Sequence, residues 1–258
     1  VRELIMLSDI AGYVGADTCG CLLAIRQDQQ EEISLMIDIG TNGEMVLGNR
    51  ERMVTCSTAA GPAFEGAKIE CGMRGAAGAV DHVKYEDGKW NYTTVGNKPA
   101  VGLCGSGLID LVAGLLDAGM LDENGVLRSG QEKQGVFILV PPERGGNERG
   151  VYLTQKDLGE VQLAKAAIAA GIQMLMERLG ITEDDICSVY IAGAFGNYMD
   201  PVSAGKIGLL PATLVKKVKP VGNAAGEGAK IALVNEKEML EMDELVRKIE
   251  FVELGCFG

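Results

Sequence analysis

Residues 34–44 read Ser-Leu-Met-Ile-Asp-Ile-Gly-Thr-Asn-Gly-Glu, an apolar run followed directly by a glycine turn. The run predicts a buried β-strand that ends near Gly40. A carboxylate at the end of a buried strand is costly unless its charge is used, so Asp38 stands out. The amides of Gly40 and Gly43 can point together at an anion, while Asp38 and Glu44 can hold Mg²⁺ through water. The alternative is an ordinary hairpin with an Asx-type turn.

The sequence on either side predicts an α/β protein with mixed sheets flanked by helices. Further strands are expected at 44–47, 52–56, 136–140, 188–192, 218–221 and 249–254, and helices at 18–26, 108–118, 154–179 and 236–248, with another ending near 235. Alternating residues around Asp87-Gly88 predict a β-hairpin over 80–95. We place Leu163 on the apolar face of the long helix at 154–179.

Two more glycine-rich turns are candidate ligand sites. The first contains Gly61 and Glu65, where small residues allow close backbone approach and the glutamate could bind a metal or a water. A simple packing loop is its alternative. The second contains Gly105 and Ser106 at the predicted N-terminus of a helix, where an anion would be stabilised. Close packing of that helix on a neighbour is the alternative there.

A further turn follows the predicted strand at 188–192 and contains Gly193, Ala194, Phe195 and Gly196. Its glycines would let a flat purine lie against the backbone, with Phe195 or Tyr198 as a wall. Each turn by itself is a weak signal. Several of them at strand ends together predict a nucleotide-binding cleft.

Composition excludes several classes of function. The 258 residues carry a net charge of −12, so we expect no binding to nucleic acid or to an anionic membrane surface. No apolar run reaches the roughly 18–20 residues that span a bilayer. Seven scattered cysteines and a lone histidine, His82, do not form a zinc-site pattern, and they predict reduced thiols in a cytoplasmic protein.

The turns share distinctive sequences: Asp38-Ile-Gly-Thr-Asn-Gly-Glu, Ala59-Ala-Gly-Pro-Ala-Phe-Glu-Gly, Gly102-Leu-Cys-Gly-Ser-Gly-Leu-Ile-Asp, Ile191-Ala-Gly-Ala-Phe-Gly-Asn-Tyr and Val221-Gly-Asn-Ala-Ala. In combination they resemble the C-terminal domain of the reductive activators of corrinoid proteins. That family consists of ATP-dependent, ferredoxin-like proteins in the superfamily of sugar kinases, chaperone ATPases and actin. The resemblance implies ribonuclease-H-like lobes that clamp ATP and Mg²⁺.

The resemblance also implies roles for individual residues. Asp38 would be the carboxylate on the metal side, and the phosphate cradle would consist of Gly40, Thr41, Asn42 and Gly43. The turn 193–196 would lie against the adenosine, with Gly61, Gly105 and Ser106 as further nucleotide contacts. Glu44 or Glu65 would orient the attacking water. A related group, the activators of 2-hydroxyacyl-CoA dehydratases, has a cluster-binding cysteine where this chain has Thr58, so we expect no such cluster here.

By the same resemblance, the chain is expected to be part of a longer protein. Residues 1–34 would link it to an upstream lobe, and 35–258 would form the second lobe, with a hairpin and loop insertion around 80–150. A first-lobe phosphate turn and a cysteine-rich segment with a 2Fe-2S cluster would lie upstream. The full-length protein, expected to be a homodimer, would use ATP to drive an electron onto the cobalt of a corrinoid protein, and this portion alone would be inactive. The alternatives are a small-molecule kinase of the superfamily and a non-catalytic nucleotide-sensing or dimerisation module.

Overall fold

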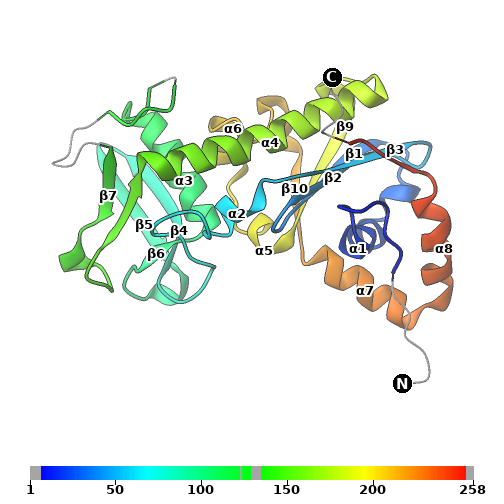
Figure 1. Cartoon of the computed structure of the whole chain (residues 1–258), viewed down its shortest axis with the longest axis horizontal. Coiled ribbons are helices and arrows are strands. Elements are labelled where there is room, and N and C mark those ends of the chain that lie inside the picture. Colours follow the sequence, from blue (N-terminus) through cyan, green and yellow to red (C-terminus); the bar gives the residue numbers. More distant parts are fainter. Residues whose placement is uncertain (1–6, 123, 129–134, 254–258) are drawn as a thin grey trace. The chain divides into compact units, whose positions relative to one another are not determined.

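The computed structural model describes residues 7–122, 124–128 and 135–253 (Figure 1). The chain folds into two compact units. Unit 1 comprises Val1–Thr58, Ala169–Asn197 and Lys216–Gly258, and unit 2 comprises Ala59–Ile168 and Tyr198–Val215. Residues 80–150, which the resemblance marks as an insertion, belong to unit 2; that they are an insertion stays a prediction.

Unit 1 is built on a six-stranded sheet with the order β10-β9-β1-β2-β3-β11. The strands are β1 (Ile33–Ile39), β2 (Gly43–Gly48), β3 (Met53–Thr58), β9 (Ile186–Ala192), β10 (Val218–Gly222) and β11 (Ile249–Phe251). The first three form an antiparallel meander, whereas β9 and β10 run parallel to β1. The predicted mixed sheet is therefore present, with each of these strands close to its expected position.

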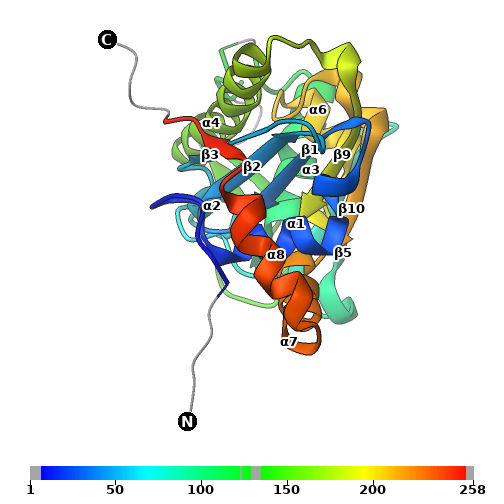
Figure 2. The same cartoon turned by 90° about the vertical axis from the view of Figure 1, so that its right-hand side faces the viewer.

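Helices cover both faces of this sheet. They are α1 (Ala16–Ile25), α5 (Gly193–Gly196), α7 (Ala224–Val234), α8 (Glu236–Val246) and the second part of α4 (Gln155–Leu179), with short 3₁₀ turns at Gln27–Gln29, Glu183–Asp185 and Ala212–Lys217. Figure 2 shows α1 and α8 in front of the strands. Met36 and Val46 lie in the buried cluster on that face, whereas Met45 and Cys56 face Gly171 of α4 on the other. Successive residues of a strand point to opposite faces, so the buried strands pack on both sides.

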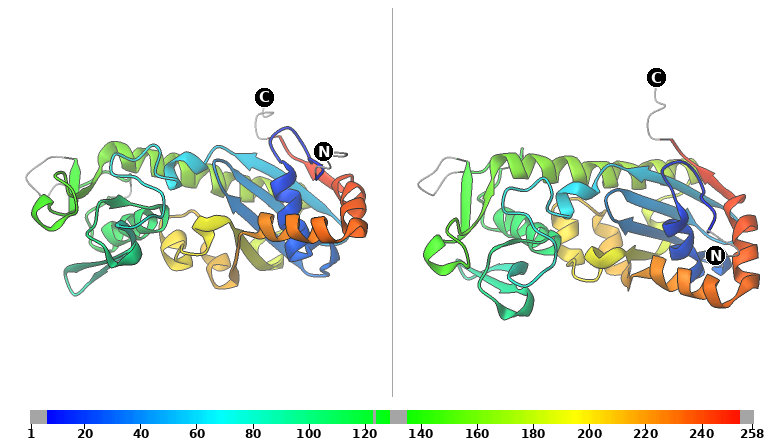
Figure 3. Two further views of the ribbon diagram at one scale, coloured as in Figure 1. Left: turned by 90° about the horizontal axis from the view of Figure 1, so that it is seen from below. Right: turned by 60° about the horizontal axis from the view of Figure 1, so that its bottom comes forward.

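The pairing of α1 with α7 depends on two glycines. In both views of Figure 3, α1 (blue) lies beside α7 (orange). A Cβ atom on Gly228 would come within 1.8 Å of the Gly20 carbonyl oxygen, and one on Gly20 within 2.7 Å of the Ala225 carbonyl oxygen. Only glycine allows the two backbones to approach this closely.

Unit 2 contains two small sheets. β4 (Ala79–Glu86), β5 (Lys89–Thr94) and β6 (Gly102–Leu103) form a sheet of order β5-β4-β6, and β7 (Val136–Val140) pairs with β8 (Val151–Thr154). The helices are α2 (Gly61–Phe64), α3 (Gly105–Asp117), α6 (Pro201–Lys206) and the first part of α4, with 3₁₀ turns at Val95–Asn97 and Pro142–Arg144. The predicted hairpin is confirmed, because Asp87 and Gly88 both have positive φ angles at its tip.

One expectation needs correction, and three short elements were not expected. Leu163 is 70% exposed, so it does not belong to the buried face of α4. The sequence also gave no signal for β6, β8 or α6, which are too short to show a clear periodicity. Among the residues that the structure describes, no helix is long and apolar enough to cross a membrane.

Candidate functional site

Three parallel strands of unit 1 end at the same level of the sheet. In the register of the strands, Asp38 of β1 lies beside Ala192 of β9, and Ala192 lies beside Gly222 of β10. The β1–β2 turn, the short helix α5 and the N-terminus of α7 follow these three ends directly. In open α/β sheets the carboxyl ends of parallel strands are where ligands bind.

Asp38 lies at the centre of this edge. A Cβ atom on Gly193 would be 2.9 Å from Asp38 Oδ1, so the turn after β9 directly approaches the carboxylate. The Cys21 thiol of α1 donates to Asp38 Oδ2 at 3.5 Å. Burial raises the pKa of Asp38, the thiol opposes this, and the negative charge of Asp17 raises it further. The two turns that the sequence predicts to share a site therefore meet here.

Glu44 is the cross-strand partner of Asp38 on β2, so both carboxylates point to the same face of the sheet. Only 9% of Glu44 is exposed, and the Ser57 hydroxyl donates to its Oε1 at 3.3 Å. Burial, with the charges of Asp17 and Asp38 as smaller contributions, raises the pKa of Glu44 from 4.5 to about 6. Among the described residues, the charged groups that shift the pKa of these two carboxylates are all acids.

The β1–β2 turn is closed by its own backbone. The Gly40 amide donates to the Asn42 carbonyl oxygen at 2.9 Å, and the Thr58 hydroxyl donates to the Gly43 carbonyl oxygen at 3.2 Å. The Gly40 amide is thus already engaged, although a Cβ atom there would meet nothing closer than 4.0 Å. The role of Gly40, Thr41, Asn42 and Gly43 as a phosphate cradle stays a prediction.

The turn after β9 needs glycine at its first position. Gly193 has a φ of +88°, which L side chains rarely adopt. Gly196 packs against its own strand, since a Cβ atom there would lie 2.5 Å from Ile191 Cγ2. The side chains of Ala194 and Phe195 lie outside the described residues, so an adenosine contact at 193–196 stays a prediction.

The remaining predicted residues lie in unit 2. Gly61 opens α2 and Glu65 follows that helix. Gly105 and Ser106 open α3, where both are buried. The Ser106 hydroxyl donates to the Asp81 carbonyl oxygen at 2.8 Å, so it is engaged within the unit. Roles for these four residues at a nucleotide stay predictions.

Sequence reasoning missed two residues of the site, Asp17 and Cys21. Both belong to α1, which precedes β1 in the chain and reaches this edge by packing against α7. Their four-residue spacing would have placed them on one helix face, but nothing local shows which element that face meets. Among the described residues, no three side chains of His, Cys, Asp or Glu are grouped closely enough to hold a metal ion by themselves.

Comparisons with known proteins identify the relatives of the chain. Residues 32–256 match the family model described as the C-terminal domain of RACo, the ASKHA domain. The corrinoid activation enzyme RamQ of Eubacterium limosum is 38% identical over 261 residues, which cover 95% of this chain and 44% of RamQ. The [Co(II) methylated amine-specific corrinoid protein] reductase of Methanosarcina barkeri is 30% identical over 269 residues, covering 96% of this chain and 47% of the reductase.

A solved structure is also similar. The reductive activator for corrinoid, iron-sulfur protein superimposes with a TM-score of 0.90 at 41% identity, over 97% of this chain and 42% of that one. The chain thus spans less than half the length of each of these relatives.

Proposed function

This chain belongs to the family of the C-terminal ASKHA domain of RACo, and we propose that it is the ATP-binding part of a reductive activator of a corrinoid protein. The family match and the structural likeness confirm the predicted α/β fold of the actin-like ATPase type. The names of the relatives support a corrinoid protein as the partner. The chain corresponds to a part of those proteins, so the activity of the whole is part of the proposal.

One observation carries the nucleotide-binding part of this proposal. Asp38 and Glu44 lie side by side at the carboxyl ends of the parallel strands, with the backbone of Gly193 against Asp38. Carboxylates of this kind, beside glycine turns, suit a triphosphate that arrives with a divalent cation. Nucleotide binding in this family would therefore use the edge of unit 1.

The residues present fit Mg²⁺. Burial and acidic neighbours raise the pKa of both carboxyl groups. A bound cation would therefore reduce the free-energy cost of ionising them. Mg²⁺ commonly uses only one or two carboxylates together with waters and substrate phosphates, which agrees with a site of two acids. When bound, it would neutralise charge on the phosphate oxygens.

The protein's own groups would then have separate tasks. Asp38, held by the Cys21 thiol at one oxygen, would bind on the metal side. Glu44, which is largely buried and accepts from the Ser57 hydroxyl, would orient the attacking water. Glu65 is the second candidate for that task. ATP would move the lobes of the whole protein by binding one arrangement better than the other.

The rest of the proposal concerns the whole protein. We place the 2Fe-2S cluster and the first lobe on upstream segments. The electron would pass from that cluster to the cobalt of the corrinoid protein. We expect the full-length protein to be a homodimer. The cysteines described as free thiols at 19, 21, 56, 71, 104 and 187 fit a reducing compartment such as the cytoplasm.

The test is Asp38→Asn in the full-length protein. We expect phosphate release from Mg-ATP to fall at least about a hundredfold, because an amide cannot replace a carboxylate beside the cation. Asp87→Asn at the tip of the β4–β5 hairpin is the matched control, and circular dichroism checks that both variants fold. Unchanged turnover in Asp38→Asn would overturn the assignment. ADP production that depended on a sugar, with no matching release of free phosphate, would favour a kinase.

A further inference from the structure

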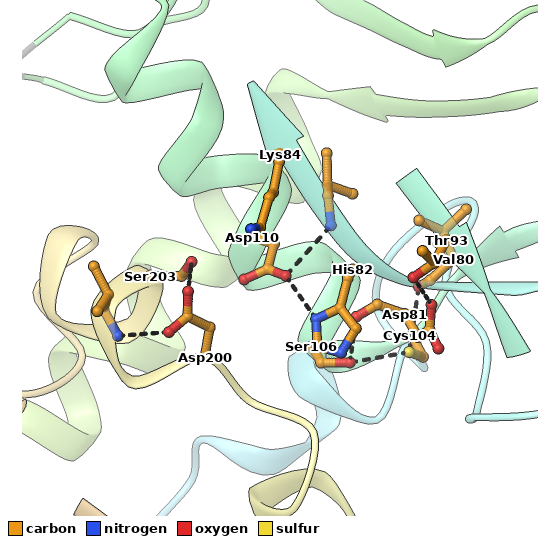
Figure 4. A network of polar contacts seen from close by, with 12 residues as sticks. Val80, Asp81, His82, Lys84, Thr93, Cys104, Ser106, Asp110, Asp200 and Ser203 are labelled. Carbon is orange, nitrogen blue, oxygen red and sulfur yellow. Dashed lines mark hydrogen bonds and ion pairs between the residues drawn. The ribbon is translucent and has the colours of Figure 1, made fainter. Parts of the chain in front are cut away.

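Unit 2 contains a cavity of about 390 Å³ that the nucleotide proposal does not use. It lies between β4, α3 and the N-terminus of α6. Its walls combine apolar surface from Val83, Ala113 and Val202 with the side chains of His82, Asp110 and Ser203. Figure 4 shows His82 and Asp110 reaching toward each other from β4 and α3. Volumes of this order suit small organic ligands.

Asp110, the last residue of the third glycine-rich motif, is the most unusual group in this cavity. Its side chain is only 4% exposed. Asp110 Oδ2 lies 3.1 Å from His82 Nδ1 and accepts from the Val83 amide at 3.3 Å. Asp110 Oδ1 is buried and has no hydrogen-bond partner among the described residues. Burial raises the pKa of Asp110, and hydrogen bonds from Ser203, His82 and the Val83 amide oppose that shift.

Two neighbouring donors have other acceptors within reach. The Ser203 hydroxyl donates to Asp200 Oδ2 at 3.2 Å, and its proximity to Asp110 also lowers the pKa of that carboxyl. The Lys206 ammonium forms an ion pair with Asp117 at 2.6 Å. Asp110 Oδ1 therefore lines a cavity as a buried acceptor that a ligand could satisfy.

Lys84 of β4, which also lines the cavity, lies near an acid other than Asp110. Lys84 Nζ lies 4.0 Å from Glu86 Oε1, and both side chains are largely exposed. A buried carboxylate oxygen that lacks a donor calls for a positively charged one. A metal ion does not fit, since within the described ranges no three His, Cys, Asp or Glu side chains are grouped to hold one.

We propose that this cavity binds a small organic molecule carrying a protonated primary amine, with the ammonium group donating to Asp110 Oδ1. The hydrocarbon part of the ligand would pack against the apolar walls at Val83, Ala113 and Val202. The site is made entirely of unit 2 residues and shares none with the edge formed by Asp38 and Glu44.

His82 makes the proposal directly testable, because it is the only histidine of the chain. The ¹H and ¹⁵N signals of its imidazole, which touches Asp110, report on the cavity without overlap. The probes are butylammonium chloride, 1-butanol as an uncharged molecule of similar shape, and magnesium chloride. At constant pH and ionic strength we expect a saturable shift with butylammonium only. Its affinity should fall at least tenfold in Asp110→Asn and stay unchanged in Asp87→Asn.

The other outcomes overturn the proposal. An equal response to 1-butanol would mean that the cavity binds hydrocarbon without using the carboxylate. A saturable response to magnesium chloride alone would assign the site to a metal. No response to butylammonium would show that Asp110 does not bind an ammonium group in this cavity. The wild-type comparison of the three probes stands even if Asp110→Asn does not fold.

Discussion

Asp38 and Glu44 are the pair of residues on which the proposed nucleotide site depends. They are cross-strand neighbours on one face of the sheet, and burial raises the pKa of both. Without a cation, burial makes ionisation of each carboxylate less favourable than in water. A ligand that brings positive charge would relieve this cost, so binding and ionisation are coupled.

Glu44→Gln tests this at the residue scale through stability. The folded pKa of Glu44 lies above its usual 4.5, at about 6, so the folded state retains a proton that the unfolded chain releases. The contribution of Glu44 to the stability of the wild type is therefore lost as the pH rises through this range, and the glutamine variant lacks this pH-dependent contribution. We expect the variant to be more stable by about 1–2 kcal/mol at pH 8, with the difference shrinking towards pH 4.5.

Urea unfolding across this pH range measures the effect. Glu31→Gln is the matched control, since the side chain of Glu31 is 77% exposed and its replacement should show no such trend. A gain for Glu44→Gln that is the same at every pH would contradict the coupling.

At the scale of elements, the crossing of α1 and α7 places the side chains that complete the site. The glycines at the crossing, Gly20 and Gly228, bring the backbones into contact. This close approach positions α1 so that Cys21 reaches Asp38 and Asp17 influences both carboxylates. Packing between two helices thereby sets the electrostatics at the strand ends.

Gly228→Ala tests that coupling. The added methyl group would collide with the Gly20 carbonyl oxygen, so the helices must separate at a cost of about 1–3 kcal/mol. We expect lower stability in urea together with weaker Mg-ATP binding, because Cys21 and Asp17 move with α1.

Gly159→Ala in α4 is the control, since a Cβ atom there would meet nothing within 4 Å and alanine favours the helix by up to about 1 kcal/mol. Wild-type stability in Gly228→Ala would show that the crossing is not tightly packed.

At the scale of the whole molecule, charge decides how the nucleotide can arrive. The chain carries a net charge of −12, and Asp17, Asp38 and Glu44 gather at the site. A free triphosphate would meet like charge there, and such repulsion is screened by salt. The cation is therefore expected to be a condition of binding as well as of hydrolysis.

Titration calorimetry on the full-length protein checks this dependence. With EDTA in place of Mg²⁺, we expect ATP affinity to fall at least about tenfold, because unscreened like charges at short range cost of the order of 1 kcal/mol or more. Added potassium chloride should recover part of the loss. Equal affinity with and without Mg²⁺ would contradict an acidic site of this kind.

Much of the fold and part of the site follow from local sequence pattern. The alternation around Asp87-Gly88 and the apolar run before Gly40 predicted a hairpin and a strand that the structure contains. Leu163 was misplaced, because a periodic pattern alone does not show how wide the covered face of α4 is. The meeting of Asp38 with Gly193 was expected from the resemblance of both turns to one family, although they lie far apart in the chain.

The sequence by itself determined where the strands end, which turns need glycine and which family the chain resembles, because these depend on residues close together in the chain. Only the tertiary structure decided that Cys21 and Asp17 complete the site and that Asp110 faces a cavity beside His82. Those arrangements depend on helix packing and on strand pairing between distant segments. Such contacts leave no periodic signal in the chain, since many different surfaces can satisfy the same local pattern.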